Sequence, residues 1–253
     1  MAGIIASSLR ALLGNLIDYA GMFPPASLAR EAAIGRYGSY QSSEHVWMLN
    51  RFVISAAQID VLPAELGWRF AVLRDADHPR ADAIESKKII SIGKPTYCEV
   101  SIEQLDEVKR AGSFAKIRTG GVTPDAIPSV DCVAAYIIGC AERRLPFKAT
   151  AGLHHPVRHV HRLTYEPDAC SATIHGFVNV FMAAAFAWHG EREIHPILAE
   201  TDVSAFQFDE RAHWRDLSLS SEEVGGSRRE FAHSFGSCSF EEPIDDLRAL
   251  GWL

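Results

Sequence analysis

The residues best suited to chemistry lie in two stretches of similar design, SFAKIRTGGVTPDAIP and LPFKATAGLHHPVRH. Because side chains alternate along a strand, Lys116 and Arg118 share one face of the first stretch, and Lys148 and Thr150 share one face of the second. If both faces point into one interior, two ammonium groups lie close together, and their burial favours the loss of a proton from one of them. A neutral amine attacks carbonyl carbons and forms a Schiff base. The alternative is that the lysines reach solvent at the strand ends.

These stretches resemble deoxyribose-phosphate aldolase, a class I aldolase with a (β/α) barrel. The resemblance rests on FAK with TGGVT, on FKATAGL about thirty residues later, and on FGSCSF near the C-terminus. It implies that Lys116 forms the Schiff base with a small carbonyl substrate and that Lys148 activates it. It also implies that FGSCSF is a phosphate-binding loop.

The FGSCSF segment predicts an anion site on physical grounds as well. Gly236, Ser237 and Ser239 leave backbone amides accessible just before a predicted helix that begins at Glu241, and helix N-termini attract anions. The alternative is that Ser239 only caps this helix, where Glu242 already supplies negative charge.

Further residues are expected at the same site. Glu99 on a neighbouring predicted strand and His154 are candidates for proton transfer. The expected substrate-binding residues, besides that loop, are Arg74, Asp75, Arg118, Thr119, Gly120, Gly121 and Thr150.

The histidines support a competing hypothesis. His154, His155, His159 and His175 could bind zinc or iron, which would make the protein a metal-dependent hydrolase or lyase. A third hypothesis is a barrel that binds a small anion and catalyses nothing. The Schiff-base lyase itself needs no metal or other cofactor.

Strands alternate with helices along the chain, which indicates an α/β fold with a parallel sheet. A TIM-like (β/α) barrel, regular or irregular, is the leading prediction, and an open parallel α/β sheet is the alternative. The predicted helices cover residues 58–66, 102–111, 125–144 and 241–250, and residues 177–188 form a core helix. Strands are predicted at residues 51–55, 69–74, 97–101, 113–118, 146–151, 206–209 and 231–237, with an eighth near 163–165. On this count the two lysines lie on the fourth and fifth strands.

We expect one domain over residues 1–253, with residues 1–45 as a helical segment packed on the barrel. Helices are predicted there to about residue 20 and again over 27–40, on either side of GMFPP.

Composition limits the partners. The net charge of -7 argues against nucleic acid as the main partner, and the apolar runs are too short to cross a membrane. Five scattered cysteines without a CxxC pair suit a reducing cytoplasm. The expected partner is a small-molecule substrate, and a homo-oligomer is compatible with the sequence.

Overall fold

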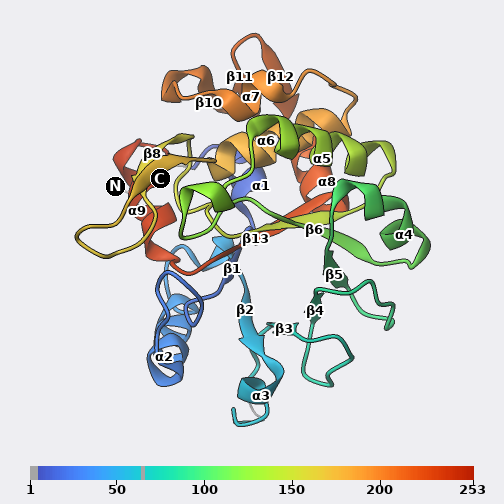
Figure 1. Cartoon of the computed structure of the whole chain (residues 1–253). Helices are drawn as coiled ribbons and strands as arrows, with labels where there is room; N and C mark the ends of the chain where they lie inside the picture. Colours follow the sequence, from blue (N-terminus) through green and yellow to red (C-terminus); the bar gives the residue numbers. More distant parts are fainter. Residues whose placement is uncertain (1–4, 64–65) are drawn as a thin grey trace.

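The computed structural model describes residues 5–63 and 66–253, and its centre is a closed barrel of eight parallel strands (Figure 1). The strands follow the chain order around the barrel, and the last one pairs with the first. This arrangement confirms the (β/α) barrel and excludes the open sheet. The barrel strands are β1 (Ile17–Tyr19), β2 (Leu49–Ser55), β3 (Phe70–Leu73), β4 (Ala83–Ser86), β5 (Thr96–Glu99), β6 (Phe114–Arg118), β7 (Phe147–Thr150) and β13 (Ala232–Ser237).

Two barrel strands, β1 and β4, are absent from the sequence-based prediction, so its assignment of segments to the barrel strands is wrong. Lys116 lies on the sixth barrel strand and Lys148 on the seventh. The N-terminal segment is more than a helical addition, because the helix α1 (Ser7–Leu13) ends before Asn15, whose φ is 48°, and β1 then enters the barrel. The predicted helix to about residue 20 is therefore wrong beyond α1, and its residues 1–4 lie outside the described part of the chain.

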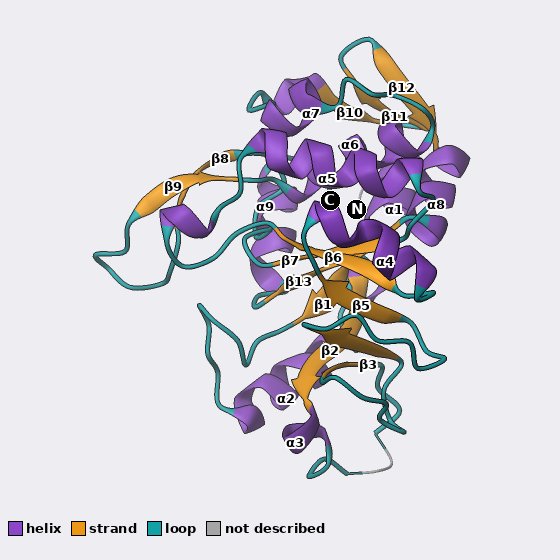
Figure 2. Ribbon diagram, turned by 45° about the vertical axis from the view of Figure 1, so that its right-hand side comes forward, coloured by secondary structure: helices purple, strands orange, loops and turns teal. Residues whose placement is uncertain are grey.

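Two predicted strands lie outside the barrel. Residues 206–209 overlap β10 (Phe206–Phe208), which pairs with β11 (Arg211–Trp214) and β12 (Leu217–Ser220) in a separate antiparallel sheet. The strand predicted near residues 163–165 is wrong, because these residues form a bend directly after β8 (His159–Arg162), which pairs only with β9 (Ser171–Ile174) among the described strands. Both small sheets are insertions between β7 and β13, and the β8–β9 hairpin projects from the barrel in Figure 2.

Helices cover the barrel unevenly. They gather around β6, β7 and β13, whereas the fully described connections 74–82 and 87–95, on either side of β4, contain no helix (Figure 2). The remaining α-helices are α2 (Arg30–Tyr40), α3 (Ala56–Ile59), α4 (Leu105–Arg110), α5 (Val130–Glu142), α6 (Phe177–Trp188), α7 (His195–Ala199), α8 (Ser221–Glu230) and α9 (Glu241–Ala249). Short 3-10 turns occupy η1 (Val46–Met48), η2 (Ile102–Gln104), η3 (Pro124–Ala126) and η4 (Val203–Ala205).

Most predicted helices are confirmed in position but not in length. The one predicted over 58–66 ends as α3 at Ile59, and residues 64–65 lie outside the described residues. The one over 125–144 is divided into η3 and α5 around Pro128, which has no amide hydrogen to donate.

The apolar core lies between the barrel and its helices. In α6 every residue from Phe177 to Ala187 is buried, and the rings of Phe177 and Phe181 lie 5.4 Å and 5.9 Å from the ring of Phe235 on β13. This confirms the core helix predicted over residues 177–188. Among the described residues, no helix has both the length and the apolarity needed to cross a bilayer.

The loops that follow β6 and β7 are held together by two glycines. A Cβ atom on Gly120 would lie 2.8 Å from the Cα of Gly152, closer than packed atoms can approach. The backbones therefore meet here because neither residue has a side chain.

We expect Gly120→Ala to lower the free energy of unfolding by about 1–3 kcal/mol, because the new methyl group must push the two backbones apart. Gly226→Ala in α8 is the matched control, since its methyl group would meet no atom within 4 Å. It should raise stability by up to about 1 kcal/mol through helix propensity. Urea denaturation of both variants measures the difference, and equal stability of the two would contradict the close packing.

Candidate active site

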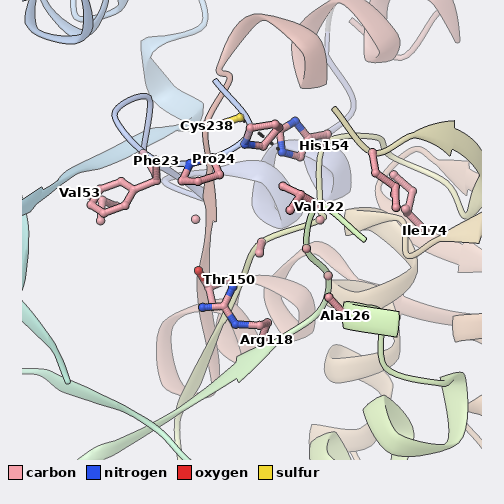
Figure 3. A pocket seen from close by; sticks show the side chains of 18 of the residues that line it. Phe23, Pro24, Val53, Arg118, Val122, Ala126, Thr150, His154, Ile174 and Cys238 are labelled. Carbon is pink, nitrogen blue, oxygen red and sulfur yellow. Dashed lines mark hydrogen bonds between the residues drawn. The ribbon is translucent and has the colours of Figure 1, made fainter. Parts of the chain in front are cut away.

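A cavity of about 1090 Å³ opens at the carboxyl ends of the barrel strands. Its floor includes Lys116, Glu85 and Glu99, and its walls come from the loops after β1, β3, β6, β7 and β13. Figure 3 shows Arg118 and Thr150 on one side of this space and His154 with Cys238 on another. Enzymes of this fold class place their active sites at this end of the barrel.

Both lysines point into the barrel interior, which is one of the two arrangements that the sequence allowed. Lys116 and Lys148 are register partners on β6 and β7, and their side chains are 6% and 1% exposed. Lys116 lines the cavity, whereas Lys148 lies beneath it and lines no part of it. A bound substrate can therefore reach the amine of Lys116 but not that of Lys148.

Carboxylates separate the two amines. The Nζ atom of Lys148 lies 2.5 Å from Asp18 Oδ2 and 2.5 Å from Glu85 Oε1. The other oxygen of Glu85 lies 3.2 Å from Lys116 Nζ, which is also 2.9 Å from Glu99 Oε2. Negative and positive side chains thus alternate along this series of ion pairs, from its buried end to the cavity.

This alternation changes the expected electrostatics. Burial by itself lowers the pKa of Lys148, but the carboxylates of Asp18 and Glu85 outweigh it and raise that pKa. Burial raises the pKa of Glu85, and here Lys148 and Lys116 outweigh it and lower that pKa. The expectation that one buried amine loses its proton to relieve repulsion from the other does not fit this geometry, because Glu85 stands between them.

Arg118 ends the series at the mouth of the cavity. Its Nε atom lies 3.2 Å from Glu99 Oε1, and half of its side chain is exposed. Burial raises the pKa of Glu99, but Lys116 and Arg118 together lower it. A bound anion would compete with Glu99 for Arg118.

The other predicted substrate-binding residues divide into two groups. Arg74, Asp75, Gly120, Gly121 and Thr150 line the cavity. Thr119 does not: it is fully buried, and its hydroxyl donates to the carbonyl oxygens of Ala151 and Thr150.

The predicted anion loop is only partly in place. Gly236 and Cys238 line the cavity, whereas the side chains of Ser237 and Ser239 are buried and accept hydrogen bonds from backbone amides. Ser239 accepts from the amide of Glu242, which is the capping role considered as the alternative.

A second polar group faces the cavity beside this loop. His154 Nδ1 lies 2.7 Å from Glu242 Oε2, and its Nε2 lies 3.7 Å from Cys238 Sγ (Figure 3). Tyr165 OH donates to Glu242 at 3.0 Å and lies 3.6 Å from the same sulfur atom. Burial by itself lowers the pKa of His154, but its hydrogen bonds to Cys238 and Glu242 raise it to about 9. His154 therefore carries a positive charge at neutral pH.

The histidines proposed as metal ligands do not converge. His155 Nδ1 contacts Asp246, and His175 is buried with Nε2 bonded to the carbonyl oxygen of Pro128. His159 is exposed on β8, away from the lining of the cavity. Within residues 5–63 and 66–253, no three His, Cys, Asp or Glu side chains are grouped as a metal site.

Three functional residues escaped the sequence analysis: Asp18, Glu85 and Cys238. Asp18 lies on β1, in a segment predicted to be helical. Glu85 lies on the short strand AIES, between segments rich in charge, and the only signal for it is one acidic residue among small and apolar ones. Cys238 could have been found from its position in the loop, directly before α9.

We expect Glu242→Gln to lower the pKa of His154 by about one to two pH units, because the carboxylate that favours the imidazolium is lost. NMR titration of the imidazole measures this directly. Since the pKa of His154 is raised on folding, the stability that Glu242 adds should be present below about pH 6.5 and be lost as the pH rises through about 9. Asp245→Asn, on the same helix but bonded to Arg248, should leave the titration unchanged.

In comparisons with known proteins, no family model, no curated protein and no solved structure matches the chain.

Proposed function

We propose that the protein is a lyase of the class I aldolase type, in which Lys116 forms a Schiff base with a small carbonyl substrate. One observation carries this proposal: Lys116 is a nearly buried amine that lines the cavity, held between the carboxylates of Glu85 and Glu99. An amine in this position has proton acceptors at hand and a space in front of it for a carbonyl carbon.

The first step is proton loss from Lys116. Its ammonium group passes one proton to Glu99, which is 2.9 Å away, and the free amine attacks the carbonyl carbon. Glu99 then returns its proton to the hydroxyl group of the addition product, which leaves as water, so that an iminium ion forms and Glu99 is again a carboxylate. Lys148 stays charged throughout, and it keeps Glu85 ionised next to the iminium nitrogen.

The second step breaks a carbon–carbon bond. A base removes the proton of a hydroxyl group on the carbon β to the imine carbon. The electrons of the Cα–Cβ bond then move towards the iminium nitrogen, and the β-carbon leaves as part of a second carbonyl compound. Protonation and hydrolysis of the resulting enamine release the other product and restore Lys116. Glu99 suits the role of base, and the positively charged His154 suits that of proton donor.

Arg118 is placed to hold an anionic group of the substrate. When such a group binds the guanidinium, Glu99 loses one of its two cationic partners, and its affinity for a proton increases. Binding of the correct substrate would thus make Glu99 a better base. The local resemblance to deoxyribose-phosphate aldolase favours a phosphorylated substrate.

Borohydride reduction should trap a covalent adduct at Lys116 when the protein is incubated with a panel of small aldehydes, ketones and sugar phosphates. Intact-mass measurement and peptide mapping identify the modified residue. Lys116→Arg should abolish the adduct and lower turnover by on the order of 10³-fold or more, because a guanidinium cannot form the imine.

Lys87→Arg is the matched control, since Lys87 also lines the cavity but is exposed and has no carboxylate partner within 4 Å among the described residues. Its adduct yield should equal that of the unmodified protein. Equal labelling of Lys87 and Lys116 would indicate unspecific amine reactivity and would overturn the proposal. Saturable binding without any adduct would instead favour a non-catalytic anion-binding barrel.

Arg118→Gln should raise KM for a phosphorylated substrate by about 10- to 100-fold, because a charge-assisted hydrogen bond to phosphate is lost. KM for the same carbonyl compound without its phosphate should change little, and glyceraldehyde with and without its 3-phosphate is a suitable pair. Arg162→Gln, at another cavity-lining arginine, serves as the control. An equal loss for both members of the pair would show that Arg118 does not select the anion.

A further inference from the structure

A second cavity, of about 580 Å³, lies at the opposite end of the barrel. Its walls come from the first residues of β2, β5, β6 and β13, from the segments just before β1 and β3, and from one face of α8. The proposed Schiff-base reaction uses none of the residues that line it. This cavity therefore needs an explanation of its own.

The charged groups that line this cavity are all basic. Four arginines contribute to it: Arg51, Arg69, Arg228 and Arg229. Among the described residues none of the four has a carboxylate oxygen within 4 Å, whereas arginines elsewhere, such as Arg143, do. Because the whole chain carries a net charge of -7, a general excess of basic residues does not explain the cluster.

The inner two arginines lack anionic partners although they are largely shielded from water. The Nε atom of Arg51 is buried and has no hydrogen-bond partner within the described part of the chain. Arg228 is 7% exposed and donates only to the backbone carbonyl oxygens of Leu12, Gly14 and Ala232. Arg228 is a buried cation without a carboxylate contact, which is costly, so this arrangement favours the arrival of an anion beside it.

The nearest carboxylates are committed elsewhere. Asp18 is bonded to Lys148 and Ser234, and Asp82 accepts from the amide of Phe70. Burial together with Arg228 and Arg51 lowers the pKa of His233 to about 4, and burial lowers that of Arg228 to about 9. At neutral pH His233 is therefore uncharged and Arg228 is charged. At Arg51 burial also lowers the pKa, but the nearby carboxylate of Asp18 outweighs it and raises that pKa.

We propose that this cavity is a binding site for a small polyvalent phosphorylated compound, separate from the site of Lys116. The planar guanidinium group matches phosphate oxygens with two parallel hydrogen bonds, and the cavity offers an inner pair of arginines and an exposed outer pair. Tyr97 and Phe114, whose rings pack 5.5 Å apart, provide a wall for the organic part of the ligand. The volume exceeds the needs of a single phosphate ion.

Calorimetric titration of the whole protein with pyrophosphate, compared with inorganic phosphate, tests this site. Pyrophosphate should bind saturably and more tightly than phosphate, and it should raise the melting temperature. The double variant Arg69→Gln/Arg229→Gln should weaken pyrophosphate binding by at least about tenfold, because both exposed guanidinium groups are removed. Arg51→Gln should weaken it in the same way from the inside.

The control is Arg30→Gln/Arg110→Gln, which makes the same change in net charge at exposed positions outside the cavity. Its affinity for pyrophosphate should stay within about twofold of the unmodified protein, since distant surface charges are screened. Arg118→Gln, which changes the other cavity, should leave unchanged the part of pyrophosphate binding that depends on Arg69 and Arg229. Absence of saturable binding, equal weakening in the control, or loss of binding in Arg118→Gln would each overturn the proposal.

Discussion

The contact on which the rest of the structure depends is the double ion pair of Glu85. One carboxylate oxygen holds Lys148 and the other holds Lys116, so the two amines sit on neighbouring strands without repelling each other directly. With Asp18 at one end and Glu99 and Arg118 at the other, three carboxylates balance three cations. Loss of Lys148 would leave the buried carboxylate of Asp18 without its cationic partner, which costs about 3–5 kcal/mol.

Because the interior of the barrel is charged, apolar packing stabilises the barrel mainly at its outer face. The side chains that fill many barrels are apolar, whereas here the axis of the barrel is occupied by ion pairs. The large apolar side chains of α6 pack instead against the outer face of β13. Each cavity is an open end of this charged interior, so charged side chains line both of them.

The sequence predicted the barrel architecture better than it predicted which segments form the strands. Alternating strands and helices indicated the barrel. The alternation of side chains placed Lys116 with Arg118 and Lys148 with Thr150, but it left open whether these faces point inward. Strand β1 was missed because three residues beside a helix carry too little pattern, and β4 because its inward residue is Glu85. The two carboxylates that contact Lys148, Asp18 and Glu85, come from these two strands, so they were missed with them.

Contacts between distant segments were beyond the sequence for a different reason. Ser239 accepts a hydrogen bond from the amide of Glu242, as a local cap would, but the carboxylate of Glu242 is bonded to His154. Local patterns describe which bonds a side chain can make with its neighbours. Local patterns do not show whether a partner 88 residues away competes for the same side chain.

The uneven cover of the barrel has a consequence for its cooperativity. Strand β4 is flanked by two connections without helices, and isoleucines of the loop that follows it, Ile89, Ile90 and Ile92, take over part of the packing. A sector protected by loops opens locally at a smaller cost in free energy than one protected by helices. Glu85 belongs to this sector, so the amide protons of β4 and the ionic bridge inside the barrel are exposed to water in the same opening event.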